Sequence, residues 1–296
     1  MEFTLRTVLF VPGDHPSRIR NAVACGPDAV AVDLEDAVAE GGKREAREAA
    51  VGALLELDSP AVSVMVRVNG VGSSHLGEDV ACLAPILPRL SAVILPKVES
   101  CEDVLTLAQL LERVERSAGM DVGGTRVVAT TETAAGILAA GQIAAASDRM
   151  LTLLFGSADL SAELRVSPTP DGTELLTARS TVVLAAAAAG LVWPLDGPYL
   201  ILDDDEGLQR SAAAARSLGF GGKAAIHPGQ LSTITATFAP TSEELAWAYE
   251  VDRAFAQGER EGRSAIRLGD GTFIDYPIAR RARALLEGGQ AEGNSP

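Results

Sequence analysis

Short apolar runs that alternate with helix-like segments constrain the fold of this chain more than any other feature. Runs that are apolar at almost every position indicate strands buried on both faces, as in a parallel sheet covered by helices. A segment with helical character follows most of the runs. The eight runs are residues 7–11, 29–34, 61–68, 92–96, 126–131, 150–155, 191–194 and 223–227.

Eight such units between residues 7 and 227 predict an α/β fold, a (β/α)8 barrel of the TIM type. A doubly wound open sheet is the alternative. It would need a glycine-rich phosphate turn after the first strand, and VPGDHP at residues 11–16 is not one. We expect the barrel over residues 1–240, a C-terminal helix and lid over 241–288, and a disordered, glycine-rich polar tail over 289–296.

Two consecutive predicted strands are each followed closely by an acid, Glu132 after residues 126–131 and Asp159 after residues 150–155. The ends of neighbouring parallel strands lie together, so the two carboxylates can converge on one cation. Two carboxylates with several open positions suit Mg²⁺, which keeps water or substrate oxygens in its octahedron. The alternative is that both acids only cap the helices that follow them.

Other predicted strands also end in polar residues, at the edge where barrels of this kind carry their active sites. So much charge is unusual for a purely structural rim. Glu35 and Asp36 either support a metal site or Arg67, or only form salt bridges. Lys97 and Glu99 are expected to pair with each other. The strand-end residues are Asp33, Glu35, Asp36, Arg67, Asn69, Lys97, Glu99, Asp196 and His227.

The net charge of −15 argues against a nucleic-acid or anionic-membrane surface. Small anionic substrates remain possible, because local arginines can bind them. The three cysteines show no paired or metal-binding spacing. The apolar run at residues 8–11 is too short for a signal peptide, and that at residues 182–193 is too short to span a bilayer. We therefore expect a cytoplasmic protein with no nucleic-acid or membrane partner.

Eight motifs follow one another along nearly the whole chain: RTVLFVPG (6–13), DLEDAV (33–38), VRVNG (66–70), LPKVE (95–99), ETAAG (132–136), GSADL (156–160), LDGPY (195–199) and GKAAIHP (222–228). With these motifs in this order, the chain resembles the citrate lyase β-subunit-like family of the HpcH/HpaI aldolase group. That family is similar to malyl-CoA and citramalyl-CoA lyases.

The resemblance implies Mg²⁺ bound by Glu132 and Asp159, with Arg67 contacting the reacting oxygens. Asp33, Glu35 and Asp36 would support these groups. The family often has basic residues for CoA after its first strand, where this chain has His15 and Asn21. The residues that would line the substrate and CoA site are Phe10, His15, Arg67, Glu132, Ala158, Asp159, Ile226 and His227.

The segment DGTFIDYP at residues 270–277 resembles the family's C-terminal lid. In that family an aspartate of the lid reaches the site of a neighbouring subunit. The resemblance therefore makes Asp275 the proton donor and acceptor. It also implies a homo-oligomer, a trimer or a hexamer.

The resemblance implies a Mg²⁺-dependent carbon–carbon lyase that cleaves or forms a short hydroxyacyl-CoA thioester, giving acetyl-CoA and a 2-oxo acid. Breaking a bond next to a carbonyl produces an enolate, and fixed positive charges lower that barrier. Two alternatives remain open: an aldolase acting on a free 4-hydroxy-2-oxo acid, and a non-catalytic CoA-binding subunit of a larger lyase complex. The sequence does not separate lyase, synthase and thioesterase outcomes.

Overall fold

A computed structural model describes residues 5–57, 62–169 and 171–293 of the chain. The residues form two compact units, Met1–Phe238 and Ala239–Pro296. The first holds a closed parallel barrel and its helices, and the second holds two helices and a small hairpin.

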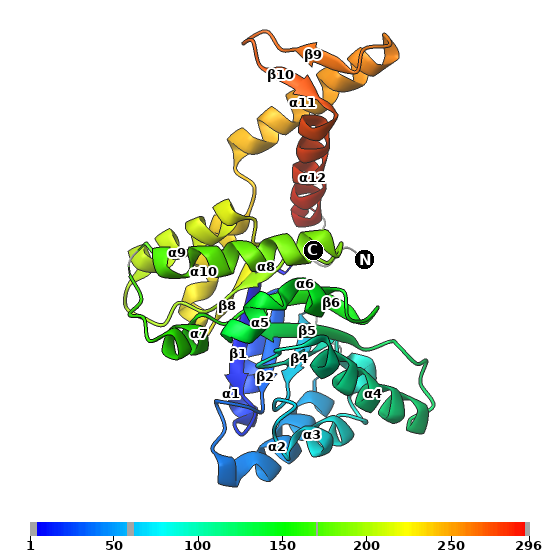
Figure 1. Ribbon diagram of the computed structural model, residues 1–296, viewed down its shortest axis with the longest axis vertical. Coiled ribbons are helices and arrows are strands. Elements are labelled where there is room, and N and C mark those ends of the chain that lie inside the picture. The colour runs from blue at the N-terminus through cyan, green and yellow to red at the C-terminus, as the bar shows by residue number, and fades with distance from the viewer. Residues whose placement is uncertain (1–4, 58–61, 170, 294–296) are drawn as a thin grey trace. The chain divides into compact units, whose positions relative to one another are not determined.

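Eight parallel strands close into the barrel of the first unit (Figure 1). The closing pair sets Thr7 of the first strand opposite Lys223 of the eighth. Closure confirms the predicted (β/α)8 barrel and excludes an open sheet, which would leave two edge strands. The strands are β1 (Thr7–Pro12), β2 (Ala29–Asp33), β3 (Ser63–Arg67), β4 (Ala92–Leu95), β5 (Arg126–Thr131), β6 (Met150–Phe155), β7 (Leu195–Asp196) and β8 (Gly222–Ala225).

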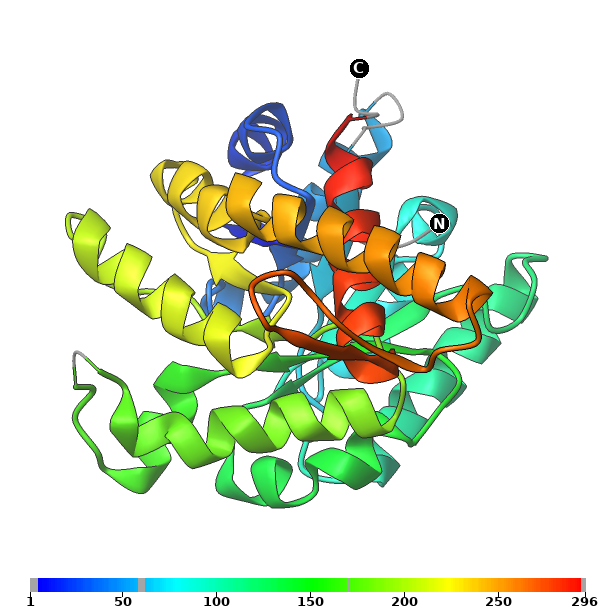
Figure 2. The ribbon, with the colours of Figure 1, turned by 90° about the horizontal axis from the view of Figure 1, so that it is seen from above.

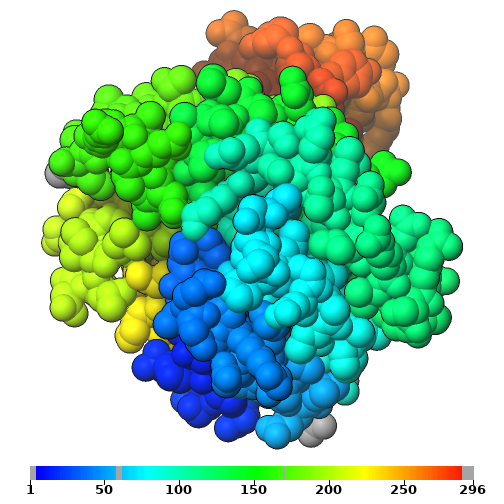
Figure 3. All heavy atoms as spheres, turned by 60° about the horizontal axis from the view of Figure 1, so that its bottom comes forward, coloured from blue at the N-terminus to red at the C-terminus, as the bar shows by residue number. Residues whose placement is uncertain are grey.

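Helices follow the strands, and the successive units run around the barrel in chain order, from blue through cyan and green to yellow in Figure 3. The helices are α1 (Pro16–Ala24), α2 (Lys43–Leu55), α3 (Leu76–Cys82), α4 (Cys101–Ser117), α5 (Ala134–Leu138), α6 (Ala140–Ala144), α7 (Ser157–Leu164), α8 (Leu176–Ala188), α9 (Asp205–Leu218) and α10 (Leu231–Phe238). Short 3-10 turns lie at Glu40–Gly42, Leu87–Arg89, Thr173–Leu175 and Pro228–Gln230.

Alternating side chains of each strand enter two different cores. In β2, Ala29 and Ala31 join a cluster inside the barrel that includes Met65. Val30 and Val32 join the larger cluster between the barrel and its helices. Both faces of the strand are therefore buried, which is why these segments read as continuous apolar runs.

A side-chain cap marks where α9 begins. The acidic run at residues 203–206 starts α9, where the carboxylate of Asp204 accepts a hydrogen bond from the backbone N–H of Gly207 at 2.9 Å.

The apolar stretch at residues 182–193 divides between α8 and the loop that follows it. Among the helices of the described residues, none combines the length and the hydropathy needed to cross a bilayer.

The second unit contains α11 (Ser242–Arg260), an antiparallel hairpin of β9 (Ala265–Arg267) and β10 (Phe273–Asp275), and α12 (Tyr276–Gly293). Figure 2 shows α11 and α12 crossing, with the hairpin beside them. Phe255 and Ile274 are fully buried in its small core. Thr241 caps α11, since its hydroxyl accepts from the N–H of Glu244 at 3.1 Å and its own N–H donates to the Glu244 carboxylate at 2.8 Å.

The hairpin lies within the segment expected to form the lid, and Gly271 in its turn has a φ of +92°. The end of the last helix differs from the sequence-based expectation. The last helix continues to Gly293, into the part of the chain expected to be disordered from residue 289. No proline interrupts the helical hydrogen bonds there, and each glycine costs only about 1 kcal/mol. Residues 294–296 lie outside the described residues.

Candidate active site

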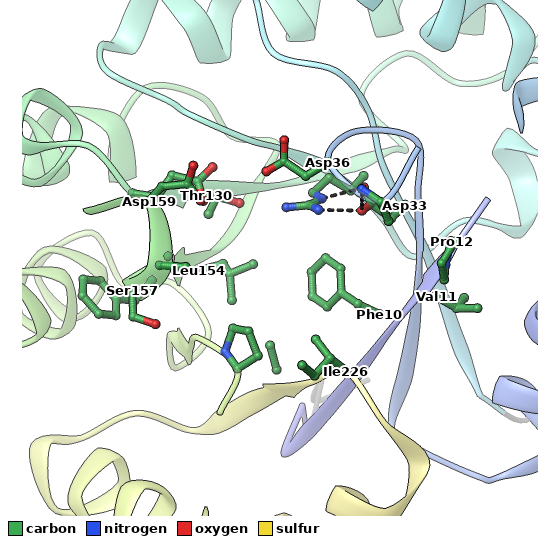
Figure 4. Close-up of a pocket in the computed structure, with 18 residues that line it drawn as sticks. Phe10, Val11, Pro12, Asp33, Asp36, Thr130, Leu154, Ser157, Asp159 and Ile226 are labelled. Carbon is green, nitrogen blue, oxygen red and sulfur yellow. Dashed lines mark hydrogen bonds and ion pairs between the residues drawn. The ribbon is translucent and has the colours of Figure 1, made fainter. Parts of the chain in front are cut away.

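A pocket of about 390 Å³ opens where the barrel strands end, lined from the carboxyl ends of β1, β2, β3, β5, β6 and β8. Asp33, Asp36 and Asp159 lie along one side of it, and Phe10 and Ile226 lie towards the other (Figure 4). One wall is therefore acidic and the other is apolar. That combination suits a small molecule with a charged end and a carbon skeleton.

Glu132 and Asp159, the acid pair, both line this pocket. Glu132 follows β5 directly, and Asp159 lies in the first turn of α7, just after β6. The register of the neighbouring strands sets Thr131 opposite Phe155, so the segments that carry the acids leave the barrel side by side. Glu132 is buried, and its Oε1 accepts a hydrogen bond from the backbone N–H of Lys97 at 2.8 Å.

The electrostatics of the acid pair favour a bound cation. Burial, together with the charge of Asp159, raises the pKa of Glu132 to about 7, although the Lys97 N–H opposes this. A divalent cation would relieve the repulsion between these two neighbouring carboxylates. Within the described residues, no group of three or more His, Cys, Asp and Glu side chains is placed to hold a metal. A set of two carboxylates fits Mg²⁺, whose remaining positions take water or substrate oxygens.

Arg67, the last residue of β3, is held in the pocket wall by Asp33 at the end of β2. Its Nε and Nη2 donate to the two carboxylate oxygens of Asp33 at 2.7 and 2.6 Å. Its guanidinium also lies 5.2 Å from the centre of the Phe10 ring. Burial would lower the pKa of Arg67, but its bonds to Asp33 raise it, so this side chain stays charged.

Glu35 joins Arg67 to Lys97. One oxygen of Glu35 lies 3.2 Å from Nη1 of Arg67, and the other accepts a hydrogen bond from Nζ of Lys97. Nζ also contacts Asp36 at 3.2 Å. Lys97 thus pairs with Glu35 and Asp36, not with Glu99 as expected, because its backbone turns the side chain across the ends of the neighbouring strands. The N–H of Glu99 donates instead to Asp103.

The predicted residues Phe10, Ala158 and Ile226 all line the pocket, and Phe10 and Ile226 form its apolar wall. Its shape depends on Gln230, which the sequence did not single out and which is buried. The Gln230 amide accepts from the backbone N–H of Ile226 at 2.9 Å and donates to the carbonyl of Tyr199 at 2.8 Å. It therefore ties the loop after β8 to the loop after β7. In the sequence, only the position of Gln230 just after the GKAAIHP motif pointed to a place near the site.

Further lining residues were not predicted. Thr130, Ser157 and Pro198 all line the pocket. The Thr130 hydroxyl is buried with no hydrogen-bond partner. Ser157 lies within the GSADL motif and Pro198 within the LDGPY motif, so their motifs were signals, whereas Thr130 carried none.

Two predicted substrate-binding residues, His15 and His227, are not among the lining residues of the pocket. His15 precedes α1 and its ring lies 3.8 Å from the Asp14 carboxylate. Nδ1 of His227 accepts a hydrogen bond from the N–H of Gly229 at 3.1 Å, so its ring turns back onto its own 3-10 turn. A role for either histidine in binding CoA stays a prediction.

Asp196 ends β7, but its carboxylate is committed to buried partners. It accepts from Nη2 of Arg179 at 2.9 Å and from Nζ of Lys223. Burial lowers the pKa of Lys223, although the neighbouring Asp196 carboxylate acts to raise it. Neither Asp196 nor Lys223 lines the pocket, and Lys223 lies between Gly222 and the interior-facing Ala224, so it points to the helix side of the barrel.

Asp275 belongs to the second unit, where it ends β10. One carboxylate oxygen of Asp275 lies 3.3 Å from the N–H of Ile278 and accepts its hydrogen bond in the first turn of α12. Its side chain is partly exposed. Its predicted role as a proton donor and acceptor in a neighbouring subunit stays a prediction.

Comparison with known proteins gives concordant matches. Residues 6–228 match the family model described as HpcH/HpaI aldolase/citrate lyase. Citrate lyase subunit beta of Haemophilus influenzae is 35% identical over 282 residues, which is 95% of this chain and 96% of that protein. The (3S)-malyl-CoA thioesterase of Cereibacter sphaeroides is 34% identical over 97% of this chain and 95% of its own length.

Solved structures agree. Protein CitE from Mycobacterium tuberculosis, in complex with magnesium, acetoacetate and coenzyme A, matches with a TM-score of 0.77 at 34% identity. The match covers 96% of this chain and 98% of that one. Barrel, motifs and full-length similarity agree: the chain belongs to the HpcH/HpaI aldolase/citrate lyase family.

Proposed function

We propose that this chain is a Mg²⁺-dependent carbon–carbon lyase acting on a short hydroxyacyl-CoA thioester such as malyl-CoA or citramalyl-CoA. The reaction would give acetyl-CoA and a 2-oxo acid, or run in the condensing direction. One observation carries the proposal: the acid pair and the guanidinium of Arg67 line the same pocket. Support comes from the CitE structure, whose ligands are magnesium, acetoacetate and coenzyme A.

Glu132 and Asp159 would hold the Mg²⁺. A magnesium ion bound there would supply a Lewis acid that polarises and orients a 2-oxo or 2-hydroxy acid. The two carboxylates would hold it on the acidic wall of the pocket. The carbon skeleton of the substrate would then lie along Phe10, Ala158 and Ile226.

Arg67 would stabilise the negative charge that develops on the reacting oxygen. Asp33 holds the guanidinium by two of its five N–H groups, which leaves others for a substrate carboxylate or enolate. Because Asp33 and Glu35 already fix its orientation, little reorganisation is needed when the charge appears. Arginine also keeps its proton throughout, so it binds without taking part in proton transfer.

Asp275 would protonate the enolate carbon, or remove that proton in the condensing direction. This role follows from the resemblance of residues 270–277 to the family's lid. In the proposal Asp275 serves the site of a neighbouring chain, in a homo-oligomer that is a trimer or a hexamer. The oligomeric state and the cytoplasmic location both stay predictions.

The direct test incubates the protein with malyl-CoA or citramalyl-CoA and Mg²⁺ and follows the products by mass. The proposal predicts acetyl-CoA together with glyoxylate from malyl-CoA and pyruvate from citramalyl-CoA. Hydrolysis to the free hydroxy acid and CoA would assign thioesterase activity instead, the activity named for the Cereibacter sphaeroides relative. Turnover of only a free 4-hydroxy-2-oxo acid would assign the aldolase alternative, and no turnover with any substrate would favour a binding subunit.

A further inference from the structure

Lys97 has an unusual backbone conformation beside the acid pair. Its φ is +51°, and among the described residues Arg165 is the only other non-glycine residue with a positive φ. Arg165 follows α7 as its C-cap, where left-handed residues are common. Lys97 is not the C-cap of a helix, because it follows the strand β4 and Pro96. A lysine in this region costs about 1–2 kcal/mol, which the surroundings must impose.

This conformation brings two parts of Lys97 to the acid pair at once. The backbone N–H donates to Oε1 of Glu132 at 2.8 Å, which fixes one oxygen of that carboxylate. The ammonium lies 3.9 Å from Oδ1 of Asp159. Among the described residues, Lys97 alone forms a hydrogen bond or an ion pair with each of the two acids.

The same ammonium reaches the network around Arg67. It donates to Glu35 and to both oxygens of Asp36, at 3.2 and 3.3 Å for Asp36. The second oxygen of Glu35 faces Nη1 of Arg67 at 3.2 Å. Without Lys97, one oxygen of Glu35 loses its partner, and that carboxylate is free to draw the guanidinium away from a substrate.

Charge also sets the strength of cation binding here. Among the described residues, the carboxylates of Asp33, Glu35, Asp36 and Asp159 form ion pairs with two cations, Arg67 and Lys97. A divalent cation on the acid pair would lie close to the Lys97 ammonium and be repelled by it. The ammonium is two-fifths exposed, so solvent weakens this repulsion without removing it.

We propose that Lys97 is a positioning residue: it orients Glu132 through its backbone, limits the affinity of the acid pair for Mg²⁺ through its charge, and holds Glu35 in place against Arg67. This inference rests on the proposed function. It predicts that loss of the side chain strengthens Mg²⁺ binding and lowers turnover. A purely structural lysine would weaken both together.

The test compares Lys97→Met with the unaltered full-length chain. Lys97→Met keeps the length and the backbone N–H but removes the charge. Calorimetric titration with MgCl₂ in the absence of substrate should show Mg²⁺ binding tighter by roughly fivefold, the screened repulsion of one nearby charge. Steady-state turnover should fall by about tenfold or more, mainly in kcat, because Arg67 loses its orientation.

Three variants control the interpretation. Lys97→Arg keeps the charge, so Mg²⁺ affinity should stay within about twofold of the unaltered chain, with turnover partly restored. Lys97→Gly suits the left-handed backbone, so it should match Lys97→Met in Mg²⁺ affinity without losing thermal stability relative to it. Arg116→Met removes an exposed charge of α4, away from the pocket, and should leave Mg²⁺ affinity unchanged.

The outcomes separate this inference from the proposed function. Unchanged or weaker Mg²⁺ binding in Lys97→Met, with normal binding in the unaltered chain, overturns the inference alone. No Mg²⁺ binding by the unaltered chain overturns both. If Lys97→Met fails to fold, Lys97→Gln takes its place with the same expected result, since it also removes the charge.

Discussion

Glu132 lies so close to Gly156 that a β-carbon built at Gly156 would stand 2.3 Å from the β-carbon of Glu132 and 2.4 Å from its Oε2. Real β-carbons do not approach other atoms so closely, and the clash involves the near end of the Glu132 side chain, which has little freedom to move. Glycine at this position therefore lets the Glu132 carboxylate lie over the start of α7, beside Asp159.

Gly156→Ala should displace Glu132 and weaken Mg²⁺ binding by about tenfold or more, the scale of a disturbed metal-ligand arrangement. Calorimetric titration with MgCl₂ measures this. Gly141→Ala in α6 is the matched control, because nothing lies within 4 Å of a β-carbon there. Equal Mg²⁺ affinity in both variants would show that Glu132 tolerates the added methyl group.

Removing either member of the acid pair should abolish Mg²⁺-dependent turnover. Glu132→Gln and Asp159→Asn keep the size of each side chain but remove the charge that binds a hard cation. Both should keep the circular dichroism spectrum of the unaltered protein while losing activity. Full activity in either variant, or in the unaltered protein with EDTA, would contradict the metal assignment.

Arg67→Lys should lower kcat/KM by about a hundredfold or more, on the scale of losing one oriented donor. Lysine keeps the positive charge but cannot bind both oxygens of Asp33, so the charge is no longer held in place. Steady-state kinetics with the preferred thioester measures the effect. A rise in KM with unchanged kcat would mean that Arg67 binds substrate and transition state equally.

The metal-free protein should lose stability as the pH rises. The pKa of Glu132 is about 7 in the folded chain against an ordinary value of 4.5, so the fold favours the protonated acid. Stability from this group is therefore full below about pH 4.5 and is lost by about pH 7, by up to about 3 kcal/mol.

Urea unfolding in EDTA at pH 5 and pH 8 measures this loss. Glu132→Gln should show a smaller difference between the two pH values, because its amide does not titrate. Added Mg²⁺ should restore stability at pH 8 in the unaltered chain only. An identical pH dependence in both proteins would assign the loss to other groups.

Mixing two inactive variants tests whether Asp275 serves a neighbouring chain. Asp275→Ala keeps its acid pair and Glu132→Gln keeps its lid. Subunit exchange should restore part of the activity, because some sites would combine an intact acid pair with an intact lid. Mass spectrometry of the mixed oligomer confirms exchange. If exchange occurs and the mixture stays inactive, Asp275 acts within its own chain or is not the acid.

The sequence by itself determined the barrel and the place of the acid pair. Buried strands in a parallel sheet show themselves as continuous apolar runs, and closure follows from eight such units. Glu132 directly follows β5, and Asp159 lies in the first turn of α7 just after β6, so strand order brings them to one pocket.

Only the tertiary structure decided which charged groups meet. Lys97 pairs with Glu35 and Asp36, which are distant in sequence, because a left-handed backbone aims it across the strand ends. Asp196, at a strand end like Glu132, pairs with Arg179 and Lys223 outside the pocket. Alternate residues of a strand face opposite sides, so a shift of one position separates a pocket residue from a buried ion pair. Composition and motif spacing do not show which side of the sheet each strand-end residue faces.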